Sequence, residues 1–362
     1  MATTTYGRSD SLTVSLWAKK LESEVLKETF ATRFMGTTSG SLIHKKTETS
    51  KGDGDRVTFG LRMQLSGAGV TEAQVLEGNE EALTTYSDAL VINELAHAVK
   101  VASQNTVDAQ RVTFDLRDEA MSALTDWFAG RIDQTFMSHI AGDTLAGGAG
   151  AAGVYTGNNA TVAASSTRIY RPNSRANDGA LTTGDDLTVG IIDKAVEIAK
   201  TASPMIRPIR VNGGEYYVLF IHPAQTTSLR ASAATSGSWA DIQKARIMGG
   251  EGDDNLLFKG GSYVGMWNGV LIYESTRIPQ GINSGAYVAN TRRAVLCGAQ
   301  AAAMAVGSKF NGDQMFKWRE ETFDYGRRLG VSVQCVWGLK KVQFNSVDYG
   351  TIVLPTLATA AA

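Results

Sequence analysis

The sequence predicts an α+β fold with a long extended arm, because strand-like and helix-like patterns follow one another along the chain. Residues 56–63 alternate strictly between apolar and polar. Residues 106–140 carry an apolar side chain at every third or fourth position, and residues 316–344 return to alternation. Period two is typical of half-buried strands, and a period near 3.6 is typical of amphipathic helices. We therefore expect a long helix that packs against strands from a distant part of the chain.

The composition allows a sizeable core and argues against a dedicated nucleic-acid-binding protein. The chain has 362 residues, of which 43% are hydrophobic and 20% are charged. This length allows one large domain or two to three smaller ones. Lys and Arg number 35 against 36 Asp and Glu, whereas domains that bind nucleic acid usually have a clear basic excess. A small basic patch stays possible.

Cysteine usage and hydropathy point to a protein of a reducing, cytoplasm-like compartment. Cys297 and Cys335 lie in apolar, strand-like runs, so two reduced core thiols are favoured over a disulfide. The first ten residues lack an apolar stretch, so we expect no signal peptide. No run approaches the roughly 20 apolar residues of a membrane-spanning helix.

The N-terminal part predicts a disordered arm over 1–10 and then an amphipathic helix over 11–34. One stripe of this helix holds the apolar residues Trp17, Leu21, Val25, Phe30 and Phe34. The polar, turn-rich stretch 36–54 leads from this helix into the arm.

The arm is predicted as two long strands around a loop rich in Gly and Glu. The first strand puts Val57, Phe59, Leu61 and Met63 on one face. The loop covers 64–81, and a second strand-like run returns from Thr84 to about Val101. An isolated two-stranded ribbon is marginal in water. We therefore expect the arm to find its buried face on another chain, which is typical of a subunit that builds an assembly.

A helix over 106–140 follows the arm and would span about 50 Å at 1.5 Å per residue. Its apolar stripe comprises Met121, Leu124, Phe128, Ile132, Phe136 and Ile140. Such length suggests a spine on which other elements lie. Residues 145–184 then predict a loop, with a short strand near 167–170.

A second region begins near residue 185, where Asp185 or Asp186 can cap a helix over 187–202 that Pro204 ends. Pro223 opens another, short helix. Strands are predicted at 216–221, 269–274, 286–289 and 294–298. This order describes an α+β unit of about 130 residues.

The final part supplies an apolar strand face that needs a partner. Val331, Val333, Cys335 and Trp337 alternate with mostly polar residues. We expect the spine helix to cover them, so that the first and last parts of the chain form one domain and the middle is an insertion. The tail 357–362 is small and is expected to be disordered.

Motifs for catalysis or metal binding are weak throughout. Glu94 and His97 match half of a di-iron pattern, but the second copy is missing and the run is strand-like, so a polar strand face is favoured. His222, before Pro223, is favoured as a strand-end residue over a catalytic base. His139, near the end of the spine helix, can favour the helix C-terminus electrostatically.

Two further sequence motifs do not support a cofactor-binding or cation-binding site. The glycines of 148–153 match a dinucleotide fingerprint without the strand that should precede it. Asp253 and Asp254 are favoured as a solvated turn over a cation site. We therefore expect no enzymatic activity, no cofactor and no metal.

Charged clusters leave two interpretations open. The loop of the arm carries Glu72, Glu77, Glu80 and Glu81, and no Lys occurs between Lys51 and Lys100. Four arginines stand near turns or strand starts: Arg207, Arg210, Arg327 and Arg328. In the first interpretation these charged residues only form solvent-exposed faces. In the second, the acidic loop at the tip of the arm docks on basic residues of a neighbouring copy. Complementary charge would then set register more than affinity.

The order of elements resembles the major capsid protein fold of tailed double-stranded DNA phages. Three strings are similar to the capsid family typified by N-four-type podophages: WAKKLESEVLKETFATRFMG, GDRVTF and FDYGRRLGVSVQCVWGLKKVQF. The resemblance implies an N-terminal arm at 1–55, an E-loop at 56–101, a P-domain spine helix with its following loop at 102–184, an A-domain at 185–312, and C-terminal P-domain strands and tail at 313–362.

The resemblance also implies a function and partners. Many copies would form pentamers and hexamers of an icosahedral shell around double-stranded DNA, without sequence-specific binding and without a membrane. Scaffolding, portal and decoration proteins are possible partners, and assembly would occur in the host cytoplasm. An encapsulin-like compartment shares the fold and is the alternative. The best-known relative crosslinks its shell through an E-loop Lys, whereas this E-loop lacks Lys before Lys100, so we expect a non-covalent shell.

Overall fold

The structure is a computed structural model. It describes most of the chain, namely residues 21, 23–46, 54–62, 65, 67–72, 74–102, 106–113, 115–145, 159–211, 213–231, 262–307 and 315–359. The predicted disordered arm 1–10, the first half of the predicted helix 11–34, Met63, the glycines of 148–153 and the pair Asp253-Asp254 lie outside these residues.

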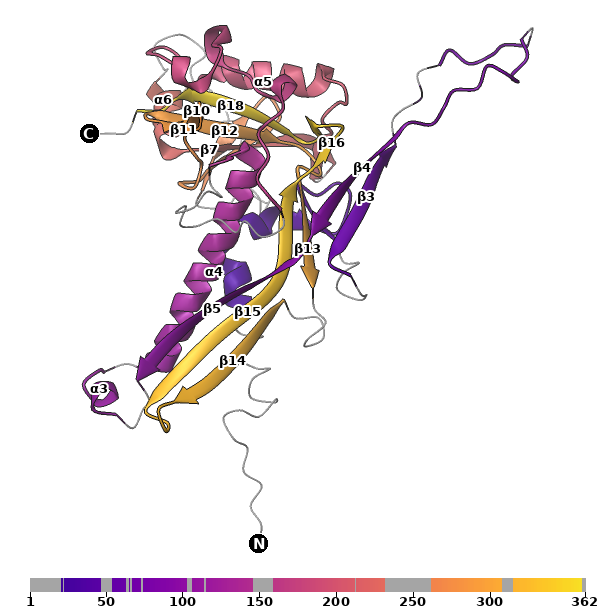
Figure 1. Ribbon diagram of the computed structural model, residues 1–362. Helices are drawn as coiled ribbons and strands as arrows, with labels where there is room; N and C mark the ends of the chain where they lie inside the picture. Colours follow the sequence, from indigo (N-terminus) through magenta and orange to yellow (C-terminus); the bar gives the residue numbers. More distant parts are fainter. Residues whose placement is uncertain are drawn as a thin grey trace.

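Two six-stranded sheets and one long helix organise the molecule (Figure 1). The first sheet has the order β1-β2-β13-β15-β14, and β5 also pairs with β15. Its strands are β1 (Met35–Gly36), β2 (Ile43–Lys46), β5 (Asn93–Ala102), β13 (Ala302–Gly307), β14 (Phe316–Phe323) and β15 (Arg328–Lys341). This sheet lies along the long helix α4.

The second sheet forms a separate lobe at one end of α4 (Figure 1). It has the order β18-β12-β7-β9-β8, and β6 pairs with β7. Its strands are β6 (Ile209–Val211), β7 (Gly214–Ile221), β8 (Tyr263–Trp267), β9 (Val270–Glu274), β12 (Thr291–Cys297) and β18 (Thr351–Leu357). Two short pairs of strands lie outside these sheets. One is the hairpin β10 (Gly281–Asn283) with β11 (Ala286–Val288), and the other is β16 (Gln343–Phe344) with β17 (Val347–Asp348).

Helix α4 runs from Leu116 to Ala141, which is 26 residues or about 39 Å. The predicted length of about 35 residues was wrong, because the helical structure is interrupted after the short helix α3 (Val107–Gln110). Asp115 then caps α4, since its carboxylate accepts a hydrogen bond from the Arg117 amide at 2.8 Å. The predicted apolar stripe is confirmed, because all six of its residues are buried.

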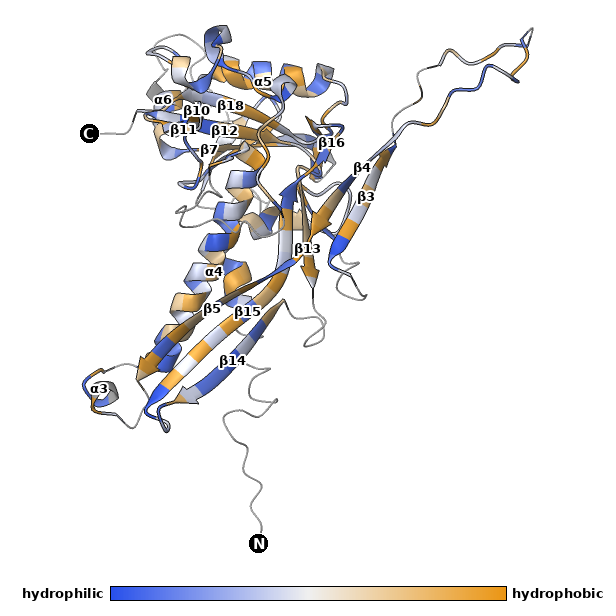
Figure 2. Ribbon diagram, viewed as in Figure 1, coloured by the Kyte–Doolittle hydropathy of each residue, from blue (hydrophilic) through white to orange (hydrophobic). Residues whose placement is uncertain are grey.

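Strand β15 supplies the face that packs against α4, as predicted. Val331, Val333, Cys335 and Trp337 are buried in the same core cluster as the α4 stripe. Figure 2 shows the hydrophobic residues alternating along β15. Cys335 and Cys297 are free, buried thiols, which confirms the prediction of reduced core cysteines, and burial raises the pKa of each.

The chain crosses between the two sheets more often than predicted. Strand β13, placed by the sequence in the inserted region, pairs with β15 in the first sheet. Strand β18, placed by the sequence with the last domain and its disordered tail, pairs with β12 in the second. Both runs are mostly apolar and lack a polar face, so their pattern does not indicate which sheet they join. The division into N-arm, E-loop, P-domain and A-domain stays a prediction.

The second lobe largely follows the sequence. Helices α5 (Val189–Thr201) and α6 (Pro223–Ala231) and the predicted strands are present, and β6, β8 and β10 are additional strands. The predicted cap was wrong, because Thr188 occupies the N-cap of α5. The Asp185 carboxylate is buried and accepts bonds from the Asn173 amide at 2.7 Å and the Arg175 guanidinium at 2.8 Å.

The N-terminal segment docks on the middle of α4. Residues 23–28 are helical, and the short 3-10 helix η1 (Phe30–Phe34) follows. The Asp133 carboxylate of α4 accepts bonds from the backbone amides of Phe30 at 2.9 Å and Ala31 at 2.8 Å. Leu21, Val25 and Phe34 enter the main core, so the apolar stripe predicted for this segment is confirmed where the structure describes it.

A buried ionic network joins the C-terminal end of α4 to the second lobe. The Asp178 carboxylate, fully buried, accepts bonds from Arg293 Nε and Arg171 Nε, both at 2.8 Å. Arg293 also donates to the carbonyl of Gly142, which directly follows α4. Because every partner comes from a different element, this network fixes the lobe on the helix end.

His139 is buried near the end of α4 and does not act as predicted. Desolvation and the positive charges of Lys341 and Lys340 lower its pKa to about 3. The neutral imidazole therefore cannot stabilise the helix C-terminus by charge, and the sequence-based expectation was wrong.

We expect His139 to make the subunit acid-labile. The unfolded chain binds this proton near pH 6.5 and the folded chain only near pH 3, so the contribution to stability is complete above pH 6.5 and falls as the pH drops towards 3. At pH 5 the loss should be about 2 kcal/mol. Urea unfolding of His139→Met at pH 7 and pH 5 should show a smaller acid-dependent loss than the original chain; equal losses would contradict the assignment.

Candidate assembly surfaces

The arm consists of strands β3 (Arg56–Arg62) and β4 (Thr85–Val91) and the loop that joins them. The two strands pair antiparallel, with Arg56 opposite Val91 and Arg62 opposite Thr85. Figure 1 shows the loop extending far from both sheets. The predicted single strand from Thr84 to Val101 was wrong, because β4 ends at Val91 and β5 pairs with β15 over its whole length.

The base of the arm is buried on its own chain. Val57 and Leu90 pack in a small core with Phe344 and Tyr349, and Phe59 lies half-buried against them. The expectation that the ribbon buries its apolar face only on another chain is therefore corrected for its base. The reason is that the hairpin β16–β17 lies beneath the ribbon and supplies the missing apolar surface.

The distal loop covers residues 65–84, and its described side chains are exposed apart from the half-buried Val70. Its four glutamates, Glu72, Glu77, Glu80 and Glu81, are exposed, and the sequence places no Lys, Arg or His among them. Four large apolar side chains are also exposed: Leu65 at 58%, Val75 at 70%, Leu76 at 61% and Leu83 at 59%. Figure 2 shows hydrophobic and hydrophilic residues interleaved along this loop.

The loop is shaped by its own hydrogen bonds. The Glu81 carboxylate accepts from the Gly67 amide at 2.6 Å and the Glu80 carboxylate from the Gly78 amide at 2.7 Å. The Asn79 side chain donates to the Val75 carbonyl at 2.8 Å. These hydrogen bonds lie within the loop, so they constrain its conformation without a partner chain.

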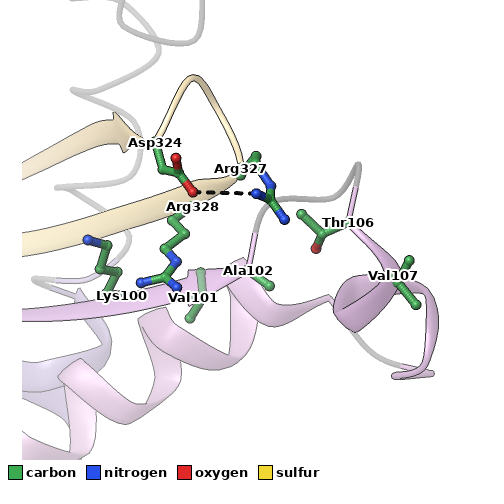
Figure 3. A pocket seen from close by; sticks show the side chains of 8 residues that line it. All are labelled: Lys100, Val101, Ala102, Thr106, Val107, Asp324, Arg327 and Arg328. Carbon is green, nitrogen blue, oxygen red and sulfur yellow. Dashed lines mark ion pairs between the residues drawn. The ribbon is translucent and has the colours of Figure 1, made fainter.

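A basic hollow lies at the opposite end of the molecule, where the β14–β15 turn meets the end of β5 (Figures 1 and 3). It has a volume of about 590 Å³ and is lined by Lys100, Thr106, Asp324, Arg327 and Arg328, with flanking apolar residues. Arg327 lies 3.9 Å from the Asp324 carboxylate. The three cations therefore outnumber the one acid around this hollow.

The turn beside this hollow projects an aromatic side chain. Tyr325 is fully exposed and has a φ of 51°, a left-handed conformation that is rare for a bulky residue. Lys100 Nζ lies 4.3 Å from the ring centroid of Phe323, on the strand that leads into the turn. An exposed aromatic beside cations is a composition that protein interfaces favour.

The structure separates the four predicted arginines into two places. Arg327 and Arg328 meet Lys100, whereas Arg207 and Arg210 lie at β6 in the second lobe. Arg210 is already paired with Glu215 at 3.0 Å, and Arg207 is exposed. Lys100 was missed as a site residue. The signal for it is the register of β5 on β15, which puts Lys100 opposite Gly330, two residues from Arg328.

His97 and His222 both make contacts within the fold. His97 stacks on Trp127 of α4 with ring centroids 4.4 Å apart, and His222 Nδ1 accepts from the Ala224 amide at 3.2 Å. Within the described part of the chain, no cluster of three or more His, Cys, Asp or Glu could hold a metal ion. None of the described helices is long and apolar enough to cross a membrane.

A spine helix under a sheet, a second lobe and a long preformed arm together define a subunit that builds a protein shell. The family model described as phage capsid protein matches residues 3–360, so the chain belongs to the phage capsid protein family. The major capsid protein of Pseudomonas phage KPP25 is 27% identical over an alignment of 382 residues that covers 96% of each chain.

Solved structures agree with this assignment. The capsid of Ralstonia phage GP4 is 27% identical with a TM-score of 0.79, over 100% of this chain and 96% of that one. The capsid of cyanophage Pam1 is 21% identical with a TM-score of 0.70, over 93% of this chain and 94% of that one, which shows the fold. The predicted tailed-phage capsid fold is confirmed.

The alternative of an encapsulin is disfavoured. The holo-SrpI encapsulin complex from Synechococcus elongatus is 12% identical with a TM-score of 0.51, over 100% of this chain and 95% of that one, so it shares the fold alone. The chain is thus the major capsid protein of a phage. It is a structural component of the virion that assembles with copies of itself.

Proposed function

We propose that this protein forms the icosahedral head that encloses double-stranded DNA, from pentamers and hexamers assembled in the host cytoplasm. The observation that carries the proposal is the preformed arm loop, whose acidic and apolar side chains are exposed at a distance from both sheets. Scaffolding, portal and decoration proteins would join this assembly. The near-neutral balance of 35 basic and 36 acidic residues suits a wall that holds DNA without gripping it.

The acidic arm loop of one copy would dock near the basic hollow of the next. Figure 1 places the loop and the β14–β15 turn at opposite ends of the molecule, so a chain cannot use its own loop for this contact. The loop contributes four carboxylates and four apolar side chains, and the hollow contributes Lys100, Arg327, Arg328 and the neighbouring Tyr325. Opposite charges at such a contact steer association and suppress wrong registers.

The contact would be non-covalent. The arm has no Lys between Lys51 and Lys100, and Lys100 itself stands on β5 in the body of the subunit. A lysine-based crosslink from the distal loop therefore has no donor in this sequence. Shell strength would then come from buried area, which in obligate assemblies is commonly about 2,000 Å² or more.

Electron microscopy of the purified protein beside light scattering tests the proposed function. Closed icosahedral particles that hold DNA when isolated from infected cells are the expected result. A stable monomer of 38.6 kDa under all assembly conditions, with or without a scaffolding partner, would overturn it. Cargo peptides inside the shell in place of DNA would favour the encapsulin-like alternative.

We expect Arg327→Ala with Arg328→Ala to weaken the shell. Both side chains are exposed in the free subunit, so their removal should leave its fold intact. If they meet the acidic loop of a neighbour, the variant shells should fall apart at a lower salt concentration than the original shells, because fewer charge pairs resist screening. Light scattering during a salt titration measures this; Arg210→Ala is the control, since Arg210 pairs with Glu215 in its own chain. Identical dissociation curves would count against the contact.

A further inference from the structure

The junction between the arm and the body carries a set of polar contacts that the shell-building role has not yet explained. At this junction β15 continues past Gly338, whereas β4 leaves the sheet towards the arm. Ile92 separates β4 from β5, and its amide bonds to the Asp55 carbonyl at 2.8 Å. The backbone groups of Val91, which precede it, point to the other side of the strand.

Asn159 takes up both backbone groups of Val91. Its Oδ1 accepts from the Val91 amide at 3.1 Å, and its Nδ2 donates to the Val91 carbonyl at 2.5 Å. The side chain amide thus replaces a neighbouring strand at the last residue of β4. Asn159 is buried, although it lies 68 residues from Val91 in the sequence.

Gly338 allows this close approach. A Cβ atom at this position would lie 2.2 Å from the Val91 carbonyl oxygen and 3.1 Å from Asn159 Nδ2. The first distance is far inside van der Waals contact, so a side chain would push β4 away from β15.

Lys340 and Asp88 form the second part of the junction. Lys340 Nζ lies 2.5 Å from Asp88 Oδ1 and also donates to the Ala89 carbonyl at 3.4 Å. The other oxygen, Asp88 Oδ2, accepts from the Gln343 amide at 3.1 Å. Lys340 and Asp88 are both mostly buried, so the loss of one partner would cost more than at a surface ion pair.

The two sides of the arm base are held differently. On one side Val57 and Leu90 pack against Phe344 and Tyr349. On the other side an open surface hollow of about 390 Å³ is lined in part by Asn159, Lys340 and Asp88. Space beside the polar contacts means that close packing does not fix the arm in this direction. On this side the arm base is held by hydrogen bonds and an ion pair.

We propose that Asn159 and Lys340 are positioning residues that set the angle between arm and body, and thereby the curvature of the shell. Neither residue reaches the distal loop that contacts the next copy. Each acts through β4, because a small rotation at Val91 becomes a large displacement at the end of the long arm. This inference rests on the proposed docking of the arm on a neighbouring copy.

The test compares Asn159→Ala and Lys340→Met with the control Lys194→Met. Lys194 is an exposed lysine on α5 that pairs with Glu197, so its loss removes one charge far from the arm. We expect both test variants to fold, with hydrogen exchange at the Val91 amide about tenfold faster in Asn159→Ala, as the loss of one net hydrogen bond implies. Their shells should show at least about twice the original spread in diameter by electron microscopy.

Each outcome decides the inference. Shells of the original diameter and spread from both test variants would overturn it, and so would unfolding of both variants, because the contacts would then belong to the folded core. A broadened distribution in Lys194→Met as well would also overturn it. If docking itself were wrong, charge reversal in the distal loop would leave assembly unchanged, whatever these variants do.

Discussion

Reversing the charge of the distal arm loop, by Glu77→Lys, Glu80→Lys and Glu81→Lys together, is expected to abolish closed shells while the subunit still folds. Each replacement changes the charge by two, so the loop goes from four negative charges to a net charge of about +2. The loop would then meet the cations around Arg327, Arg328 and Lys100 with like charge, which slows association and costs several kcal/mol at close contact. Subunit folding should survive because the glutamates are exposed.

Two controls separate charge from shape in this experiment. The glutamine versions of the same three residues remove charge but keep side chains that can accept hydrogen bonds, and they should lower the yield of shells less. Glu197→Lys alters an exposed acid on α5 and should assemble as the original chain does. Circular dichroism checks folding, and sedimentation measures shells. If the triple lysine variant gave the original yield of closed shells, the proposed docking of the loop on a neighbouring copy would be contradicted.

Asp178→Ala is expected to destabilise the subunit by about 3–5 kcal/mol, the cost of removing one partner from a buried ion pair. The Asp178 carboxylate is fully buried and bonds to Arg293, to Arg171 and to the Ile282 amide at 3.0 Å. Its removal leaves the Arg293 guanidinium buried without its charge partner. Because Arg293 also holds the carbonyl of Gly142, the lobe should loosen from the end of α4.

Chemical denaturation of the unassembled subunit measures this loss, and Glu197→Ala provides the matched control. Glu197 pairs with Lys194 at 2.8 Å on the surface of α5, where an ion pair is worth about 0–1 kcal/mol. Hydrogen exchange should locate the effect of Asp178→Ala at the hairpin β10–β11 and the end of α4. A loss below about 1 kcal/mol would mean that the network is not needed for the lobe to hold its position.

Local periodicity predicted the elements that bury one regular face. The stripe of α4 from Met121 to Ile140 and the alternation of Val331 to Trp337 both lie in the main core, as their spacing indicates. Periodicity could not show where β4 ends, because residues 84–101 keep their strand character across Ile92 while their partner changes from β3 to β15. Strand pairing depends on residues that are distant in the sequence, so the local hydrophobic periodicity of a strand does not reveal its partner.

The candidate surfaces were predictable to different degrees. The four glutamates of the loop lie within ten residues of one another, so the acidic surface can be predicted from the sequence alone. The basic hollow needs the register that carries Lys100 of β5 to Arg328 of β15. The junction of the arm needs Asn159 and Val91 together, which are 68 residues apart. The docking of loop on hollow stays a prediction.

The pairing of β15 and β18 has a consequence for the nascent chain. Strand β15 joins β5, β13 and β14, and β18 is the edge strand beside β12. The first sheet therefore cannot form before β15 is synthesised, and the second sheet stays incomplete until β18 follows. At 5–20 residues per second, the arm and the following strand β5 leave the ribosome roughly 10–50 s before β15, the strand with which β5 pairs. During that time the arm is present without the folded sheet to which it is attached. Folding after release depends on pairings between distant residues and is therefore expected to be slow.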